Sequence, residues 1–201
     1  MASPCRRSGR RREPRGVNRI VALPRRLLDA LRAEVRAASW FAALGEPLTE
    51  GDRGDAVGYL AALGFDALEI GLAHDWPDAE RLLKAPDWTP AWWDREEALR
   101  RSLLAEAETR YLERTLWSSL TELTAETGDL VHGKAATAAA RMGKAAAASI
   151  HVAAGAASQA VYQLALTRLA EQPASPFESK FRLYAAGRWP LGVRDSRLIL
   201  F

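Results

Sequence analysis

The chain has 201 residues, of which 48% are hydrophobic and 26% are charged. These fractions are ordinary for a globular protein and exclude a wholly disordered chain. A single cysteine, Cys5, excludes an intramolecular disulfide and fits a reducing compartment, so we expect a cytoplasmic protein.

The positive charge is concentrated at the N-terminus. Residues 1–16 hold six arginines and one glutamate, a net of +5 against +3 for the whole chain, which leaves about −2 for residues 17–201. No apolar run follows these arginines, so the segment does not match an export signal, and we expect a disordered tail. Three hypotheses remain open: an arm for nucleic acid or anionic lipid, an organelle presequence, and an extension without function, which we favour.

Residues 17–88 are predicted to form the N-terminal helices. Leucines at helical spacing after Pro24 predict a helix over residues 24–44, and a second helix is predicted over residues 50–63 before Gly64. A helical segment over residues 65–73 and a short helix over residues 77–85 complete this part.

Residues 89–172 are predicted to form a long helical hairpin. Its first helix begins at Thr89 and Pro90, an N-cap followed by a first-turn proline, and is expected to run to Gly128. Its buried face changes near residue 111, which predicts either a bend there or burial on both sides beyond it. The second helix, over residues 129–171, contains 15 alanines among residues 135–165 and is expected to be central, because small side chains allow close packing.

Residues 173–201 are predicted to form a short helix and a β-hairpin. Ser175 and Glu178 have the spacing of a capping box that opens the helix. Residues 189–193 and 197–201 have the composition of short strands, and an isolated hairpin is only marginally stable, so we expect it to pack on the helices or join another strand.

The predicted fold is therefore mainly α: a helical bundle built around a long antiparallel helical hairpin, with a short C-terminal β-hairpin. Residues 17–201 are expected to form a single helical domain. Residues 145–167 carry no charge but are rich in alanine and contain polar side chains, so we expect a buried bundle helix and no membrane span.

One segment has the glycine and lysine spacing of a phosphate-binding loop. Gly128 is followed by Gly133 and Lys134, but Ala135 stands where that loop needs a hydroxyl for magnesium. The loop also follows a strand, whereas a helix is predicted here. An ordinary turn between two helices is the better interpretation.

The three histidines give little support to a metal site. His74 with Asp75 has the order of a phosphohydrolase dipeptide, but no upstream histidine accompanies it, and a capped helix start explains it better. If His132 and His151 share one helix, they are separated by about 28 Å and cannot bind the same ion. We expect no metal, no cofactor and no catalytic residue that can be named.

His151 and the tryptophans are the candidate functional residues. His151 lies in the uncharged, alanine-rich stretch, where small neighbours could leave a pocket beside it, although a core histidine is the more ordinary interpretation. Most of the seven tryptophans are expected to fill the core. Trp93 and Trp189 are the candidates for an interface with a partner.

Three functions remain open. The first is a non-enzymatic helical protein that acts through a protein–protein interface, with a protein partner or a second copy of the chain. The second is an enzyme or small-ligand binder with a pocket near His151. The third is nucleic-acid binding through residues 1–16. We favour the first, because no catalytic motif is recognisable.

Overall fold

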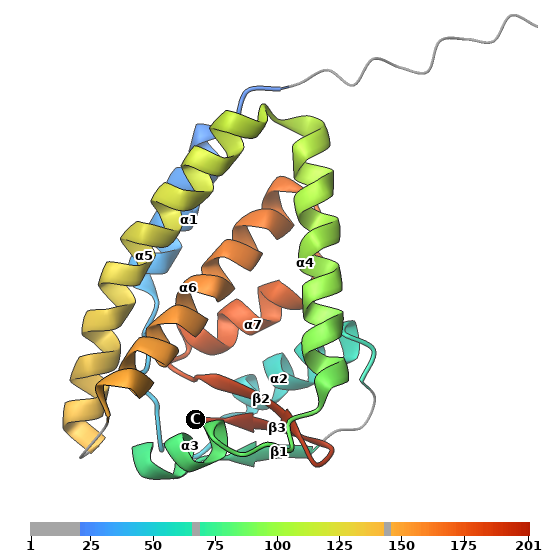
Figure 1. Ribbon diagram of the computed structural model, residues 1–201. Coiled ribbons are helices and arrows are strands. Elements are labelled where there is room, and N and C mark those ends of the chain that lie inside the picture. The colour runs from blue at the N-terminus through green and yellow to red at the C-terminus, as the bar shows by residue number, and fades with distance from the viewer. Residues whose placement is uncertain (1–20, 66–68, 143–145) are drawn as a thin grey trace, which may run out of the picture.

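The computed structural model describes residues 21–65, 69–142 and 146–201. In these residues the fold is mainly helical with a small sheet, as predicted (Figure 1). The elements are α1 (Arg25–Ala37), α2 (Glu50–Ala62), β1 (Glu69–Leu72), α3 (Trp76–Leu83), α4 (Pro90–Arg110), α5 (Glu113–Met142), α6 (Ala147–Leu169), α7 (Pro176–Ala185), β2 (Pro190–Arg194) and β3 (Arg197–Leu200).

The sheet joins the C-terminal hairpin to a strand from the first half of the chain. Its order is β1-β3-β2, with β3 antiparallel to β2 and parallel to β1. The prediction of a helix over residues 65–73 is wrong at β1, where Ile70 pairs with Leu198. Local pattern could not identify this strand, because its partner lies more than a hundred residues away.

Three long helices follow one another through α4, α5 and α6. In Figure 1, α4 and α5 diverge from the turn that joins them, and α6 runs back along α5 towards that turn. The change of buried face near residue 111 corresponds to the end of α4: Tyr111 is extended, with φ −120° and ψ 153°, and pairs with Val21.

The ends of these helices differ from the prediction. α5 continues through Gly128 and Gly133 to Met142, and α6 begins at Ala147. A glycine inside a helix costs only about 1 kcal/mol relative to alanine, and the close packing of α5 against the alanine-rich α6 offsets this. Similarly, α1 ends at Ala37, before the predicted Leu44, because the chain turns inward and buries Trp40 and Phe41.

The main core is aromatic where the C-terminal segment meets the helices. The rings of Trp76, Trp189 and Phe201 lie within 6.4 Å of one another, and Phe41 packs edge-on against Trp189 at 6.2 Å. Trp40 adds a further buried indole. Most tryptophans therefore lie in or against the core, as predicted, but Trp93 and Trp117 are exposed.

Arg188 anchors the C-terminal segment. Its guanidinium is buried, pairs with Asp52 at 3.0 Å, and donates to the backbone carbonyls of Ala43, Glu46 and Pro47. The preceding Gly187 has φ +93°, and a Cβ there would lie 2.7 Å from a backbone nitrogen. These contacts explain why a glycine and an arginine stand at positions 187 and 188, directly before the hairpin.

No helix in the described parts of the chain is long and apolar enough to cross a membrane.

Candidate functional site

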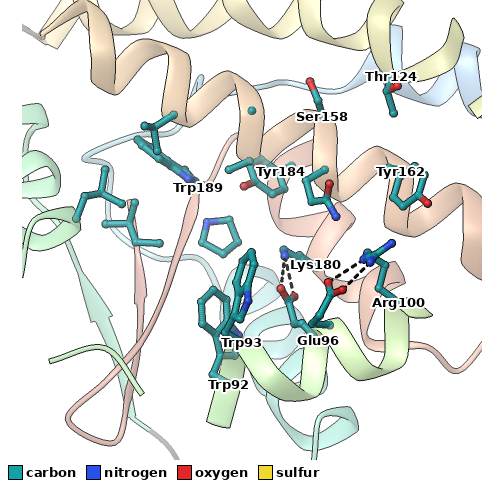
Figure 2. A pocket seen from close by; sticks show the side chains of 18 of the residues that line it. Trp92, Trp93, Glu96, Arg100, Thr124, Ser158, Tyr162, Lys180, Tyr184 and Trp189 are labelled. Atoms are coloured by element: carbon teal, nitrogen blue, oxygen red, sulfur yellow. Dashed lines mark hydrogen bonds and ion pairs between the residues drawn. The ribbon is translucent and has the colours of Figure 1, made fainter. Parts of the chain in front are cut away.

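A cleft of about 880 Å³ opens between α4, α5, α6 and the C-terminal segment (Figure 2). α4 contributes Trp92, Trp93, Glu96, Glu97 and Arg100. The other lining residues are Leu83, Trp117, Thr124, Val152, Gly155, Ala156, Ser158, Gln159, Tyr162, Lys180, Tyr184, Trp189, Pro190 and Leu191.

Large apolar side chains around this cleft remain in contact with solvent. Trp93 is 58% exposed, Trp117 is 39% exposed and Val152 is 50% exposed, and they belong to α4, α5 and α6 respectively. Exposed apolar side chains that surround a concave surface from three helices are typical of a binding site.

A buried ion pair lies at the floor of the cleft. The Lys180 ammonium donates to both carboxylate oxygens of Glu96, at 2.7 and 2.9 Å, and both side chains are less than 10% exposed. The Tyr59 hydroxyl also donates to Glu96, at 2.7 Å, and accepts a hydrogen bond from the Trp92 indole at 2.6 Å. Burial raises the pKa of Tyr59 well above its ordinary value, and the neighbouring Glu96 carboxylate raises it further.

Tyr184 lies beside this pair, between Trp189 and Lys180 in Figure 2. Its hydroxyl is buried and has no hydrogen-bond partner among the described residues. Burial raises the pKa of Tyr184, and the charge of Glu96 adds to the effect, so the hydroxyl stays protonated and able to donate. Leaving such a group unpaired costs free energy unless a ligand completes it.

A second ion pair lies further along α4. Arg100 donates to both carboxylate oxygens of Glu97, with the Nε bond at 2.8 Å, and its guanidinium lies 6.0 Å from the centre of the Tyr162 ring. The hydrogen bond to Glu97 raises the pKa of Arg100, so it stays charged. Both basic groups of the cleft are therefore neutralised by a carboxylate, and the cleft carries no excess charge.

The structure brings two of the three candidate residues to one place. Trp93 and Trp189 both line the cleft, the first exposed and the second buried. His151 is not among the lining residues; its side chain is exposed, one turn of α6 before Gly155. The pocket near His151 therefore stays a prediction: His151 does not line this cleft, although its neighbour Val152 does.

Sequence reasoning missed Glu96 and Lys180. Glu96 stands four positions before Arg100, a spacing typical of charge pairs on a solvated helix face, and Lys180 lies 84 positions away. Nothing in their local sequence distinguishes them from surface charges. Only the packing of α7 against α4 reveals that this particular carboxylate is buried.

The remaining motifs do not form sites. Gly128, Gly133 and Lys134 lie inside α5, so no phosphate-binding loop exists there. Asp75 caps α3 by accepting from the backbone N–H of Asp78, as predicted for a capped helix start. Among the described residues no group of three or more histidine, cysteine or acidic side chains could hold a metal ion. Residues 1–16 lie outside the described part.

The chain is thus a mainly helical protein with a three-stranded sheet and an aromatic cleft over a buried ion pair. No known protein family, characterised protein or solved structure was found to be similar to it.

Proposed function

We propose that the chain is a binding protein whose cleft takes a largely apolar organic molecule. The observation that supports this best is the composition of the cleft: aromatic walls contributed by Trp93, Trp117 and Trp189, with the charged groups of the lining paired with one another. Its volume of about 880 Å³ lies within the range of small-molecule sites, roughly 300–1,000 Å³.

The charges define the class of ligand further. Because Lys180 is paired with Glu96, and Arg100 with Glu97, neither cation has an uncompensated charge that would select an anion. Among the buried polar atoms of the described lining residues, the Tyr184 hydroxyl is without a partner. The expected ligand is therefore uncharged, with an apolar body and one hydrogen-bond acceptor that reaches Tyr184.

The first test fills the cleft without disturbing the fold. Gly155 lines the cleft in the middle of α6, and a Cβ there meets nothing within 4 Å. Gly155→Trp should therefore fold, because tryptophan forms helix better than glycine, and should occupy the space of the ligand. We expect it to weaken the binding of the uncharged dye N-phenyl-1-naphthylamine at least tenfold, measured by fluorescence titration.

A matched control is available on the neighbouring helix. Gly133 lies in α5, also has open space around its Cβ, and does not line the cleft. Gly133→Trp should bind the dye as the unchanged chain does. Equal binding by the two variants, or no binding by the unchanged chain, would refute the proposal.

A second candidate occupant is the apolar segment of another protein, in line with the interface hypothesis. The exposure of Trp93, Trp117 and Val152 at the cleft favours it, because isolated proteins rarely leave such side chains together in solvent. Native mass spectrometry separates the two: a small added mass supports the organic ligand, whereas a dimer that Trp93→Ala dissociates supports a second copy of the chain.

A further inference from the structure

His132 and His151 lie against each other across the seam between α5 and α6. Their ring centres are 4.7 Å apart and the ring planes are tilted by 33°. The prediction that these residues are too far apart to share an ion assumed a single helix. It is wrong, because the chain reverses direction between Met142 and Ala147, and this reversal brings the two rings together.

The pair is open to solvent and has no other partner in the described residues. His151 is exposed and His132 is half-buried. Neither imidazole makes a hydrogen bond or an ion pair to any other residue that the structure describes, so the ring nitrogens are not committed to a structural role. Both rings also lie outside the lining of the cleft.

We propose that His132 and His151 together bind a divalent late first-row transition metal. Imidazole nitrogen is a preferred ligand of Cu²⁺, Ni²⁺ and Zn²⁺. The rings are close enough that a rotation of the side chains lets one ion bind a nitrogen from each. No third histidine, cysteine or carboxylate in the described residues joins the pair, so water completes the coordination. Cu²⁺ should bind most tightly, as the general order of affinities predicts, and Mg²⁺ should not bind.

The two ligands come from different helices, so a bound ion should stabilise the folded chain. A bound ion links α5 to the first turns of α6. Because the unfolded chain does not hold the two imidazoles together, the metal stabilises the folded state. A hundredfold excess of free metal over its dissociation constant should raise the melting temperature by about 5–10 °C.

The test uses the full chain stripped of metal with a chelator. Isothermal titration with Cu²⁺ and Zn²⁺, and melting followed by circular dichroism, are compared between the unchanged chain and His132→Ala, His151→Ala and His74→Ala. We expect each of the first two variants to lose at least tenfold in affinity and to lose the rise in melting temperature. His74→Ala removes an exposed histidine elsewhere and should behave as the unchanged chain.

The control also accounts for other metal-binding groups, since Cys5 and the terminal amine are common to all four proteins. Electron paramagnetic resonance of the Cu²⁺ complex should show two nitrogen ligands in the unchanged chain and in His74→Ala. Equal affinity in all four proteins would overturn the proposal. So would metal-free melting temperatures that fall in the two variants without any metal-dependent difference, because that result assigns the rings to packing alone.

Discussion

At the scale of single residues, two buried tyrosines provide a matched comparison. Tyr59 donates to Glu96 and accepts from Trp92, whereas the hydroxyl of Tyr184 has no partner among the described residues. Removing a satisfied buried hydroxyl leaves its partners unpaired, but removing an unpaired one leaves nothing unsatisfied. We expect Tyr59→Phe to lower the free energy of unfolding by about 1–3 kcal/mol and Tyr184→Phe to change it by less than about 0.5 kcal/mol.

Alkaline pH adds a second test of the same residues. Burial raises the pKa of Tyr59 and Tyr184, so the unfolded chain releases these protons first. The stabilisation that comes from keeping these two hydroxyls protonated is therefore fully present below the ordinary tyrosine pKa of about 10. It is lost as the pH rises above that value. Urea unfolding at pH 8 and at about pH 10.5 should show a smaller alkaline loss in Tyr184→Phe than in the unchanged chain. An equal loss would contradict this account.

At the scale of elements, α6 is capped from outside its own sequence. Its N-cap residue, Ala146, offers no side-chain acceptor. The carboxylate of Glu80, on α3, instead accepts from the Ala146 backbone N–H at 2.7 Å and from the Ser149 hydroxyl at 2.5 Å. Trp76 donates to the same hydroxyl at 2.8 Å. A carboxylate at the positive end of a helix stabilises it, so α3 contributes to the stability of α6.

Removing this cap gives a prediction with a defined pH dependence. The hydrogen bond from Ser149 lowers the pKa of Glu80, and the bond from the Ala146 backbone adds to this. Because the folded-state pKa is lowered, the stabilisation is present above the ordinary glutamate pKa and is lost as the pH falls through the lower folded-state pKa. Glu80→Ala should therefore cost about 1 kcal/mol at pH 7 and progressively less below pH 4. Denaturant unfolding measures the difference, and Glu80→Gln, which keeps one acceptor, should lose less.

At the scale of the whole molecule, Arg188 connects three distant parts of the chain. It ties the C-terminal segment to Asp52 in α2 and to the carbonyls between α1 and α2. Arg188→Met should lower the free energy of unfolding by about 3–5 kcal/mol, because Asp52 and the carbonyls then remain buried without a partner. Arg194→Met is the control: its ion pair with Asp87 is partly exposed, so the loss should be under about 1 kcal/mol. Similar losses in thermal unfolding of the two variants would argue against a special role for Arg188.

The candidate site also belongs to the whole molecule. Its floor unites Glu96 from α4 with Lys180 from α7, Tyr59 from α2 donates to Glu96, and its walls add α5, α6 and β2. Trp93 and Trp189 were identifiable as candidates from their residue type, but 96 positions separate them and nothing local places them in one cleft.

The sequence by itself determined most of the helices. The spacing of apolar residues, the capping positions of Asp75 and Ser175, and the alanine-rich composition of α6 are local properties, and a helix depends mainly on neighbours within a few positions. The C-terminal hairpin was identifiable for the same reason. The tertiary structure alone decided where packing overrides local preference. In the tertiary structure α5 continues through Gly128 and α1 ends early. β1 pairs with β3, and α6 packs along α5 so that His132 meets His151. These features depend on contacts between residues far apart in the chain, and such contacts leave no periodic trace in the sequence.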